Sequence, residues 1–230
     1  MKYRSVFDII GPVMVGPSSS HTAGAVRIGL LARRLFGRAP ERADIHLYGS
    51  FAHTYRGHAT DVALLAGVLG MNTDDPNIPR AFALAQKSGL TYAFHAEAAV
   101  PDHPNTTRIV LTAQDARISV TGVSLGGGLV QLTRVDGFEL RLSGENPALL
   151  IFHEDAAGTI AAATQLLAQS NINISHMEVS RAQRGQDAHL AHTLKDGHQQ
   201  RVGHDHRHDQ HDDAVEQVIE THGGLHRFQK

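Results

Sequence analysis

The chain has 230 residues, of which 41% are hydrophobic, and a formal net charge of -2. This length suits one large or two small domains with a buried core. The scattered lysines and arginines indicate neither a nucleic acid nor an anionic membrane as a partner, and the absence of cysteine excludes disulfides, thiolate nucleophiles and iron–sulfur ligation by this chain.

No segment reaches the ~20 consecutive apolar residues of a membrane span. The first residues, MKYRSVFDIIGP, lack the uninterrupted apolar stretch of a secretion signal. We therefore expect a cytoplasmic protein of the ordinary globular class.

The first part of the chain alternates helices and strands. Residues 22–36 carry apolar side chains at helical spacing, and Gly37 is placed to end that helix. The segment ADIHLYGSF (43–51) alternates apolar and polar residues, as a half-buried strand does. A polar stretch from Gly57 to Asp61 then leads into the apolar run VALLAGVLG, which predicts a second long helix.

A sheet follows these helices. A short helix at residues 81–87 leads into three strands, TYAFHAEA, TRIVLTA and ARISVTGVSL. Two further alternating runs, LVQLTRV and FELRLSG, are joined by Asp136 and Gly137. Both residue types adopt positive φ readily, so the pair predicts a type I′ hairpin turn.

The pattern restarts near residue 147. The next six runs predict the order βαββαβ: ALLIFH, GTIAAATQLLAQS, INISHMEVSRA, DAHLAHTL, AVEQVIETH and LHRFQ. In this order AVEQVIETH (214–222) is the second helix and LHRFQ (225–229) is the last strand. The expected fold class is therefore α+β. A mixed-sheet domain at 1–146 precedes a ferredoxin-like domain at 147–230.

A histidine-rich insertion interrupts this second domain at residues 195–213. The stretch KDGHQQRVGHDHRHDQHDD is too polar to enter a core and predicts a solvated loop. Imidazoles and carboxylates suit zinc, nickel or copper, but such a tract has no fixed ligand geometry. We expect weak, adventitious metal binding, and a dedicated metal-binding role remains an alternative; the histidines concerned are His198, His204, His206, His208 and His211.

The motif GPSSSHT places polar side chains at the start of the first helix. The first N–H groups of a helix lack partners and the dipole end is positive, so anions are favoured there. One serine or threonine suffices to cap a helix, whereas this motif offers a set: Ser18, Ser19, Ser20 and Thr22. The alternatives are a simple cap and a cradle for a carboxylate or phosphate, with His21 handling a proton.

A Ser–His nucleophile pair is a weaker interpretation of the same motif. Adjacent residues at a helix start rarely point at each other, and the chain has no G-x-S-x-G elbow. Hydrolase chemistry is therefore disfavoured.

A second motif, GSFAHTYRGHATD (49–61), again places small, hydroxyl and histidine residues between a strand end and a helix start. Two such loops are expected to face one pocket. The alternative is a polar connector in which Thr60 or Asp61 caps the next helix.

Three segments together resemble the beta subunit of iron–sulfur-dependent L-serine dehydratases: VFDIIGPVMVGPSSSHTAGAVRIG, GSFAHTYRGHATDVALLAGVLG and SVTGVSLGGG. The resemblance implies a two-chain enzyme that converts L-serine to pyruvate and ammonia, with a [4Fe-4S] cluster on the cysteines of a partner alpha subunit. It also implies that the first domain is similar to a regulatory domain of some phosphoglycerate dehydrogenases and that the second is an ACT module.

Carried over by motif, the resemblance implies catalytic roles for His21 and His58, without deciding which of them is the base. The implied substrate-contacting residues are Ser18, Ser19 and Ser20, with Thr60 and Asp61 beside them as capping or bracing groups.

Two departures from the family pattern matter. Ala59 stands where the family usually has glycine, which would cost about 1 kcal/mol if the backbone there requires positive φ. In the ACT-like unit the usual D-x-P-G turn lacks its proline. ACT modules often bind a small amino acid near that turn, for which the candidates are Asp155, Gly158, Asn171 and Asn173. The alternative is a module that only joins subunits.

Two other function classes remain open. One is a stand-alone regulatory module that binds serine or a related amino acid, and the other is a metal-binding protein that uses the histidine tract. The expected partners under the leading interpretation are the alpha subunit, L-serine and further copies of the chain joined through the ACT module.

Overall fold

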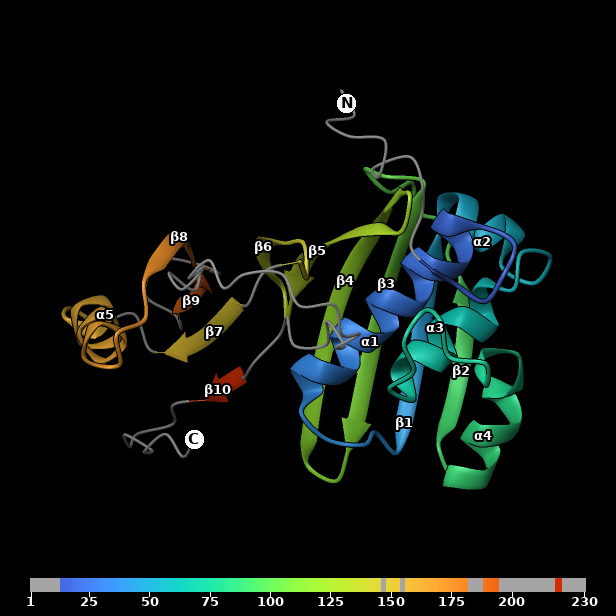
Figure 1. Cartoon of the computed structure of the whole chain (residues 1–230), viewed down its shortest axis with the longest axis horizontal. Helices are drawn as coiled ribbons and strands as arrows, with labels where there is room; N and C mark the ends of the chain where they lie inside the picture. The colour runs from blue at the N-terminus through green and yellow to red at the C-terminus, as the bar shows by residue number, and fades with distance from the viewer. Residues whose placement is uncertain (1–12, 146–147, 154–155, 182–187, 195–217, 221–230) are drawn as a thin grey trace, which may run out of the picture. The chain divides into compact units, whose positions relative to one another are not determined.

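The structure, a computed structural model, describes residues 13–145, 148–153, 156–181, 188–194 and 218–220 (Figure 1). The chain forms two compact units, residues 1–143 and 144–230. The boundary after residue 146 remains a proposal from the sequence. Among the described residues, no helix is long and apolar enough to cross a membrane.

The first unit is built on a six-stranded mixed sheet in the order β2-β1-β3-β4-β5-β6. β1 pairs parallel with β2, and the other neighbours pair antiparallel. The predicted mixed sheet is confirmed. The strands are β1 (Arg42–Tyr48), β2 (Thr91–Ala96), β3 (Asn105–Ala113), β4 (Ala116–Gly126), β5 (Leu129–Val135) and β6 (Phe138–Leu142).

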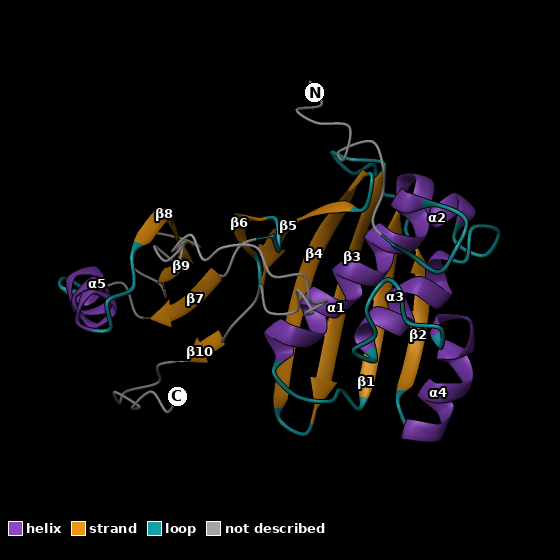
Figure 2. Cartoon of the chain, in the orientation of Figure 1, coloured by secondary structure: helices purple, strands orange, loops and turns teal. Residues whose placement is uncertain are grey.

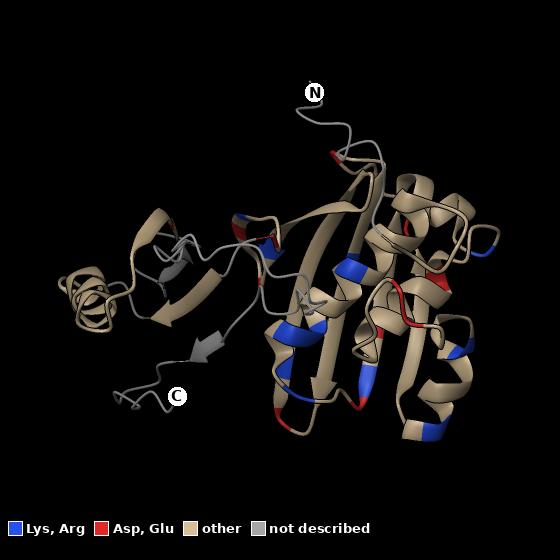
Figure 3. Cartoon of the chain, in the orientation of Figure 1, with Lys and Arg blue, Asp and Glu red and all other residues tan. Residues whose placement is uncertain are grey.

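Helices cover one face of this sheet (Figure 2). A π-helical turn at Ser19–Ala23 continues directly into α1 (Gly24–Phe36), so the first helix starts three residues earlier than predicted, at Ser19 instead of Thr22. The other helical elements are α2 (Gly49–Thr54), α3 (Thr60–Val68), a 3₁₀ turn (Ile78–Arg80) and α4 (Ala81–Ser88). Lysines and arginines lie on several of these elements, including α1 and α4 (Figure 3).

The alternation of inward and outward side chains along the strands places the hydrophobic core between the sheet and the helices. Ala43, Ile45 and Leu47 of β1 are fully buried, as the sequence pattern predicts. The hairpin between β5 and β6 is also confirmed, because Asp136 (φ 47°) and Gly137 (φ 88°) both adopt the left-handed conformation that a type I′ turn requires.

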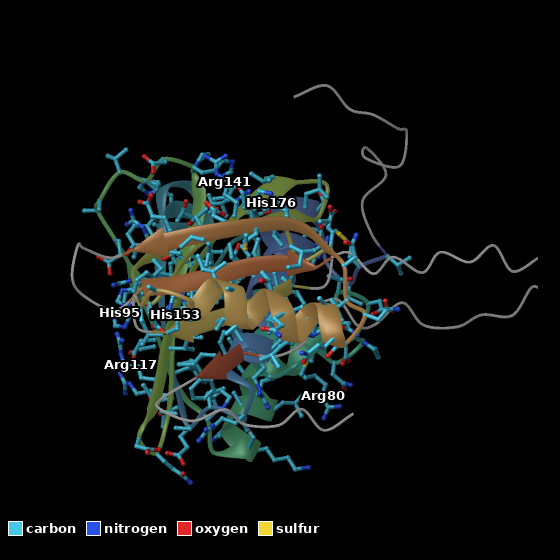
Figure 4. The ribbon with its side chains drawn as sticks, turned by 90° about the vertical axis from the view of Figure 1, so that its left-hand side faces the viewer. Arg80, His95, Arg117, Arg141, His153 and His176 are labelled. Atoms are coloured by element: carbon cyan, nitrogen blue, oxygen red, sulfur yellow. The ribbon has the colours of Figure 1, made fainter. Side chains whose placement is uncertain are left out.

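The opposite face of the sheet carries paired polar side chains. His46 Nδ1 lies 2.6 Å from Glu97 Oε1, and His95 Nε2 lies 3.2 Å from Asp44 Oδ1. The two imidazoles stack with ring centroids 4.6 Å apart. Figure 4 shows His95 and Arg117 on the side opposite Arg80, which precedes α4. The hydrogen bond from His46 lowers the pKa of the Glu97 carboxyl.

The second unit holds a four-stranded sheet in the order β10-β7-β9-β8 and one described helix. β7 (Ala148–His153), α5 (Thr159–Gln169), β8 (Ile174–Arg181) and β9 (Ala188–Leu194) follow the predicted order. The prediction of a helix at 214–222 is wrong over its described residues, because β10 (Val218–Glu220) is a strand parallel to β7. Its β-branched residues suit a strand, where pairing satisfies the backbone groups. The predicted strand at 225–229 and the insertion at 195–213 lie outside the described residues.

Close contact between α1 and α3 depends on two glycines. A methyl group at Gly67 would overlap the carbonyl oxygen of Val26, and one at Gly29 would overlap the carbonyl oxygen of Leu64. These backbone atoms cannot move away as a flexible side chain could. The two helices therefore pack at a distance that only glycine permits.

We expect Gly67→Ala to lower the free energy of unfolding by about 3 kcal/mol, because the added methyl forces α1 and α3 apart. Urea unfolding of the first unit measures this loss. Gly57→Ala is the matched control, since a methyl group there would meet no atom closer than 3.7 Å. Equal stability of the two variants would contradict the proposed close packing.

Candidate active site

The GPSSSHT motif forms the π-helical turn that opens the first helix. The Ser18 hydroxyl oxygen accepts a hydrogen bond from the backbone N–H of His21 at 3.2 Å, and the Ser18 carbonyl accepts from Thr22 N–H at 2.8 Å. Ser18 is therefore a helix cap, as the simpler of the two interpretations of the motif predicted. Capping accounts for one of the hydroxyl residues of the motif and leaves the others unexplained. In the described part of the chain, the Ser19 hydroxyl makes no hydrogen bond, which leaves it available to a ligand.

His21 is held at both ring nitrogens. Its Nδ1 lies 3.0 Å from Ser20 Oγ, and its Nε2 lies 3.2 Å from Ser50 Oγ. The expectation that neighbouring serine and histidine do not point at each other is wrong here, because Ser20 and His21 sit on a π-turn rather than on a regular helical turn. Sequence reasoning did not single out Ser50, although it lies inside the second motif.

The second motif meets the first at His21. The ring of His58, from the connection between α2 and α3, lies edge-on to the ring of His21 with centroids 4.8 Å apart. Phe51 packs against the same ring at 5.3 Å. The two motifs thus meet at His21 and His58, as expected, and that they line one pocket stays a prediction. His58 is exposed, whereas His21 is half-buried.

The environment of His21 disfavours its charged form. Burial, followed by the neighbouring His58, lowers the pKa of His21. A neutral imidazole can donate at one nitrogen and accept at the other, and both adjacent groups are hydroxyls that can take either role. His21 is therefore a neutral group at neutral pH with both nitrogens partnered.

The start of α3 departs from the predicted cap. Its N-cap is Ala59, which makes no side-chain bond, and the Thr60 hydroxyl is fully buried with no hydrogen-bond partner in the part of the chain that the structure describes. Asp61 Oδ1 accepts from the N–H of Val62 at 2.8 Å, so the capping role falls to Asp61 and not to Thr60. Burial raises the pKa of the Asp61 carboxyl. Thr22 Oγ1 is a second buried hydroxyl without a partner among the described residues.

The third segment, SVTGVSLGGG, anchors the GPSSSHT turn to the sheet. The buried Ser124 hydroxyl donates to the carbonyl of Ser20 at 2.9 Å, and Asn105 Nδ2 donates to the carbonyl of Ser124 at 3.4 Å. In the first turn of α1, Arg27 donates to the carbonyl of Gly128 at 2.9 Å. The end of β4 thereby fixes the height of the first helix above the sheet.

The described candidates for amino-acid binding in the second unit lie at the two opposite ends of α5. Gly158 (φ 93°) is the N-cap of α5, and Asn171 (φ 57°) and Asn173 follow that helix. Asp155 and the histidines of the insertion, the candidates for weak metal binding, lie outside the described residues. Within the described ranges, no cluster of histidine, aspartate and glutamate is arranged to hold a metal ion.

Comparison with known proteins identifies the family. Residues 5–90 match the serine dehydratase beta chain family, and residues 148–221 match the ACT domain. A probable L-serine dehydratase beta chain of Bacillus subtilis (strain 168) is 55% identical over 81% of this chain and 84% of its own length. The chain belongs to the L-serine dehydratase beta chain family.

Two other relatives extend this result. The L-serine dehydratase beta chain of Peptoniphilus asaccharolyticus is 37% identical over 77% of this chain and 81% of its own. The D-3-phosphoglycerate dehydrogenase of Synechocystis is 28% identical over 75% of this chain and 31% of its own. The α+β fold class and the family resemblance expected from the sequence are confirmed.

Ala59 has the conformation that makes its methyl group costly, with φ 55° and ψ 29°. We expect Ala59→Gly to raise the free energy of unfolding by about 1 kcal/mol, because glycine adopts positive φ without a steric penalty. Urea unfolding measures the change. Ala52→Gly, inside α2, is the control for the same substitution in helical backbone and should lower stability; a loss in both variants would contradict strain at Ala59.

The lowered pKa of His21 makes stability depend on pH. In the unfolded chain a histidine takes up its proton near pH ~6.5, before the folded His21 does. The stabilising effect of the neutral ring is complete above that value and is lost as pH falls toward the lower folded pKa. We expect wild type to lose more unfolding free energy than His21→Gln between about pH 7 and about pH 5. The exposed His53→Gln is the control, and identical pH profiles for wild type and His21→Gln would contradict the assignment.

Proposed function

We propose that this chain is the beta chain of a two-chain L-serine dehydratase and that Ser19, His21 and His58 belong to the active site. The observation that carries the proposal is the meeting of the two family motifs at the paired rings of His21 and His58, 4.8 Å apart. The reaction would convert L-serine to pyruvate and ammonia.

The two helix starts supply an environment for the substrate carboxylate. The helix that opens at Ser19 and α3, which opens at Thr60, bring their N-terminal ends near the same pair of histidines. Helix N-termini favour anions through unpaired N–H groups and the dipole. The free Ser19 hydroxyl adds a donor there, and Ser18 and Ser20 shape the turn around it. Thr60 and Asp61 support the second helix start.

The geometry favours different roles for the two histidines. Both nitrogens of His21 are engaged by serine hydroxyls, whereas the His58 side chain is exposed and, among the described residues, is contacted through ring packing alone. A base must reach the proton that it removes. We therefore assign proton transfer at the substrate Cα to His58, with His21 as the neutral group that orients it.

The residues of this chain do not fit an iron–sulfur cluster. The chain contains no cysteine, and thiolates are the usual ligands of such clusters. We propose that a [4Fe-4S] cluster is held by the cysteines of a partner alpha subunit. Such a cluster supplies a Lewis-acidic iron that assists departure of a hydroxyl group.

The chemistry balances without further cofactors on this chain. Loss of the Cα proton and of the β-hydroxide from L-serine gives 2-aminoacrylate and water. The enamine tautomerises to 2-iminopropanoate, and hydrolysis by one water yields pyruvate and ammonia. The developing negative charge at the carboxylate is what fixed N–H and hydroxyl donors stabilise.

The test is anaerobic pyruvate formation from L-serine by this chain co-purified with a cysteine-bearing alpha subunit. We expect His58→Ala to lower kcat/KM by a factor of about 10² to 10⁴, the range for loss of a general base. Ser19→Ala should lower kcat/KM about tenfold through one lost donor.

Ser88→Ala is the matched control, because among the described residues its hydroxyl bonds only the carbonyl of Ala85 at the end of α4. Full activity of His58→Ala and Ser19→Ala in an assembled complex would overturn the proposal. A regulatory role in binding an amino acid would then be the better interpretation.

The second unit supports a proposal about assembly. Apolar side chains are exposed on β8, at Met177 and Val179, and on α5, at Ile160 and Leu166. Exposed apolar groups on an edge strand favour association with another copy. We propose that the ACT unit at 147–230 joins copies of the chain and that the protein works in the cytoplasm. We also propose that the unit binds a small amino acid near Gly158, Asn171 and Asn173. Weak metal binding by the histidine-rich insertion is a separate property to be tested.

A further inference from the structure

Ser50 belongs to the second motif, but no role was expected for it from the sequence. It is the second residue of α2 and its hydroxyl oxygen lies 3.2 Å from Nε2 of His21. The other ring nitrogen of His21 bonds Ser20, the residue before it in the chain. Ser50 is therefore the only described hydrogen-bond partner of the His21 ring that comes from outside the GPSSSHT turn.

The backbone holds the Ser50 side chain in place. Ser50 N–H donates to the carbonyl of Pro104 at 2.7 Å, and Thr54 Oγ1 donates to the carbonyl of Ser50 at 2.7 Å. Gly49 before it has φ 54°, and a methyl group there would lie 2.6 Å from the Pro104 carbonyl oxygen. The loop before β3 and the first turn of α2 thus fix the position of the hydroxyl.

Two hydroxyls at opposite nitrogens determine how the His21 ring is oriented. An imidazole bonded at Nδ1 alone can tilt about that bond, whereas partners at both nitrogens restrict the ring plane. Because His58 packs edge-on against this ring, at an interplanar angle of 84°, the plane of His21 also sets the surface on which His58 rests. Phe51, next to Ser50 in α2, packs on the same ring and is fully buried.

We infer that Ser50 is a positioning residue for the dehydratase reaction: it fixes the ring of His21 through Nε2 and, through that ring, the placement of His58. This inference rests on the proposed function of the two histidines. It adds a residue on a different helix whose contribution is made through His21 and not by contact with the substrate.

The experiment compares Ser50→Ala, Ser50→Thr and Ser88→Ala in the complex with the alpha subunit. We expect Ser50→Ala to lower kcat about tenfold while KM changes less than about twofold, because orientation affects the proton-transfer step more than binding. Ser50→Thr retains a hydroxyl and should stay within about threefold of wild type. Ser88→Ala should match wild type.

A second readout follows the ring directly. In full-length chain labelled with ¹⁵N-histidine, the His21 ring nitrogen signals, assigned by their loss in His21→Gln, should shift in Ser50→Ala and not in Ser88→Ala. Melting temperatures report whether the variants remain folded.

The outcomes separate the two ideas. If His58→Ala is inactive while Ser50→Ala keeps wild-type kcat or leaves the His21 signals unmoved, the inference about Ser50 is wrong and the proposed function stands. If His58→Ala is itself fully active, the proposed function fails first. If Ser50→Thr is as impaired as Ser50→Ala, the hydroxyl is not the group that matters, and the inference also fails.

Discussion

The candidate site depends on the close contact between α1 and α3. Gly29 and Gly67 let the two helix backbones approach until a single methyl group on either would overlap a carbonyl oxygen of the other. The first helix carries His21 in its opening turn, and His58 lies two residues before the start of α3. A larger separation of the helices would therefore separate the two imidazoles, so the packing of two glycines governs the geometry of the candidate site.

A second set of contacts fixes the first helix on the sheet. Two hydrogen bonds run in opposite directions between the first helix and the end of the β4–β5 hairpin. Ser124 on β4 donates to the carbonyl of Ser20 in the opening turn, and Arg27 on α1 donates to the carbonyl of Gly128 in the loop. A methyl group at Gly24 would overlap the Ser124 hydroxyl, so this contact too requires a small residue. Functional side chains on short turns gain precision when the backbone beneath them is held at several points.

Much of this arrangement could be predicted from the sequence, and the failures have physical causes. The alternation in β1 and the Asp136–Gly137 turn are local patterns, and the structure follows both. The alternation predicts a strand that runs to residue 51, which is wrong for its last three residues, because the chain turns into α2 at Gly49. This helix is too short for a helical period to show, so the sequence does not indicate the position of Ser50. Whether Ala59 requires positive φ depends on how the chain enters α3, which no local pattern encodes. The wrong assignment at 218–220 arose because VIE suits either a helix face or a strand, and pairing with β7 decides between them.

The residues placed around the paired histidines lie in the first unit, between Ser18 and Ser124, while the ACT match begins at residue 148. Each described contact around the paired histidines is made by residues of that unit. Selection can then alter, exchange or delete the second module without rebuilding the first. The same division makes the unit from 1 to 143 the natural piece to transplant when the paired-histidine site is to be joined to a different second domain.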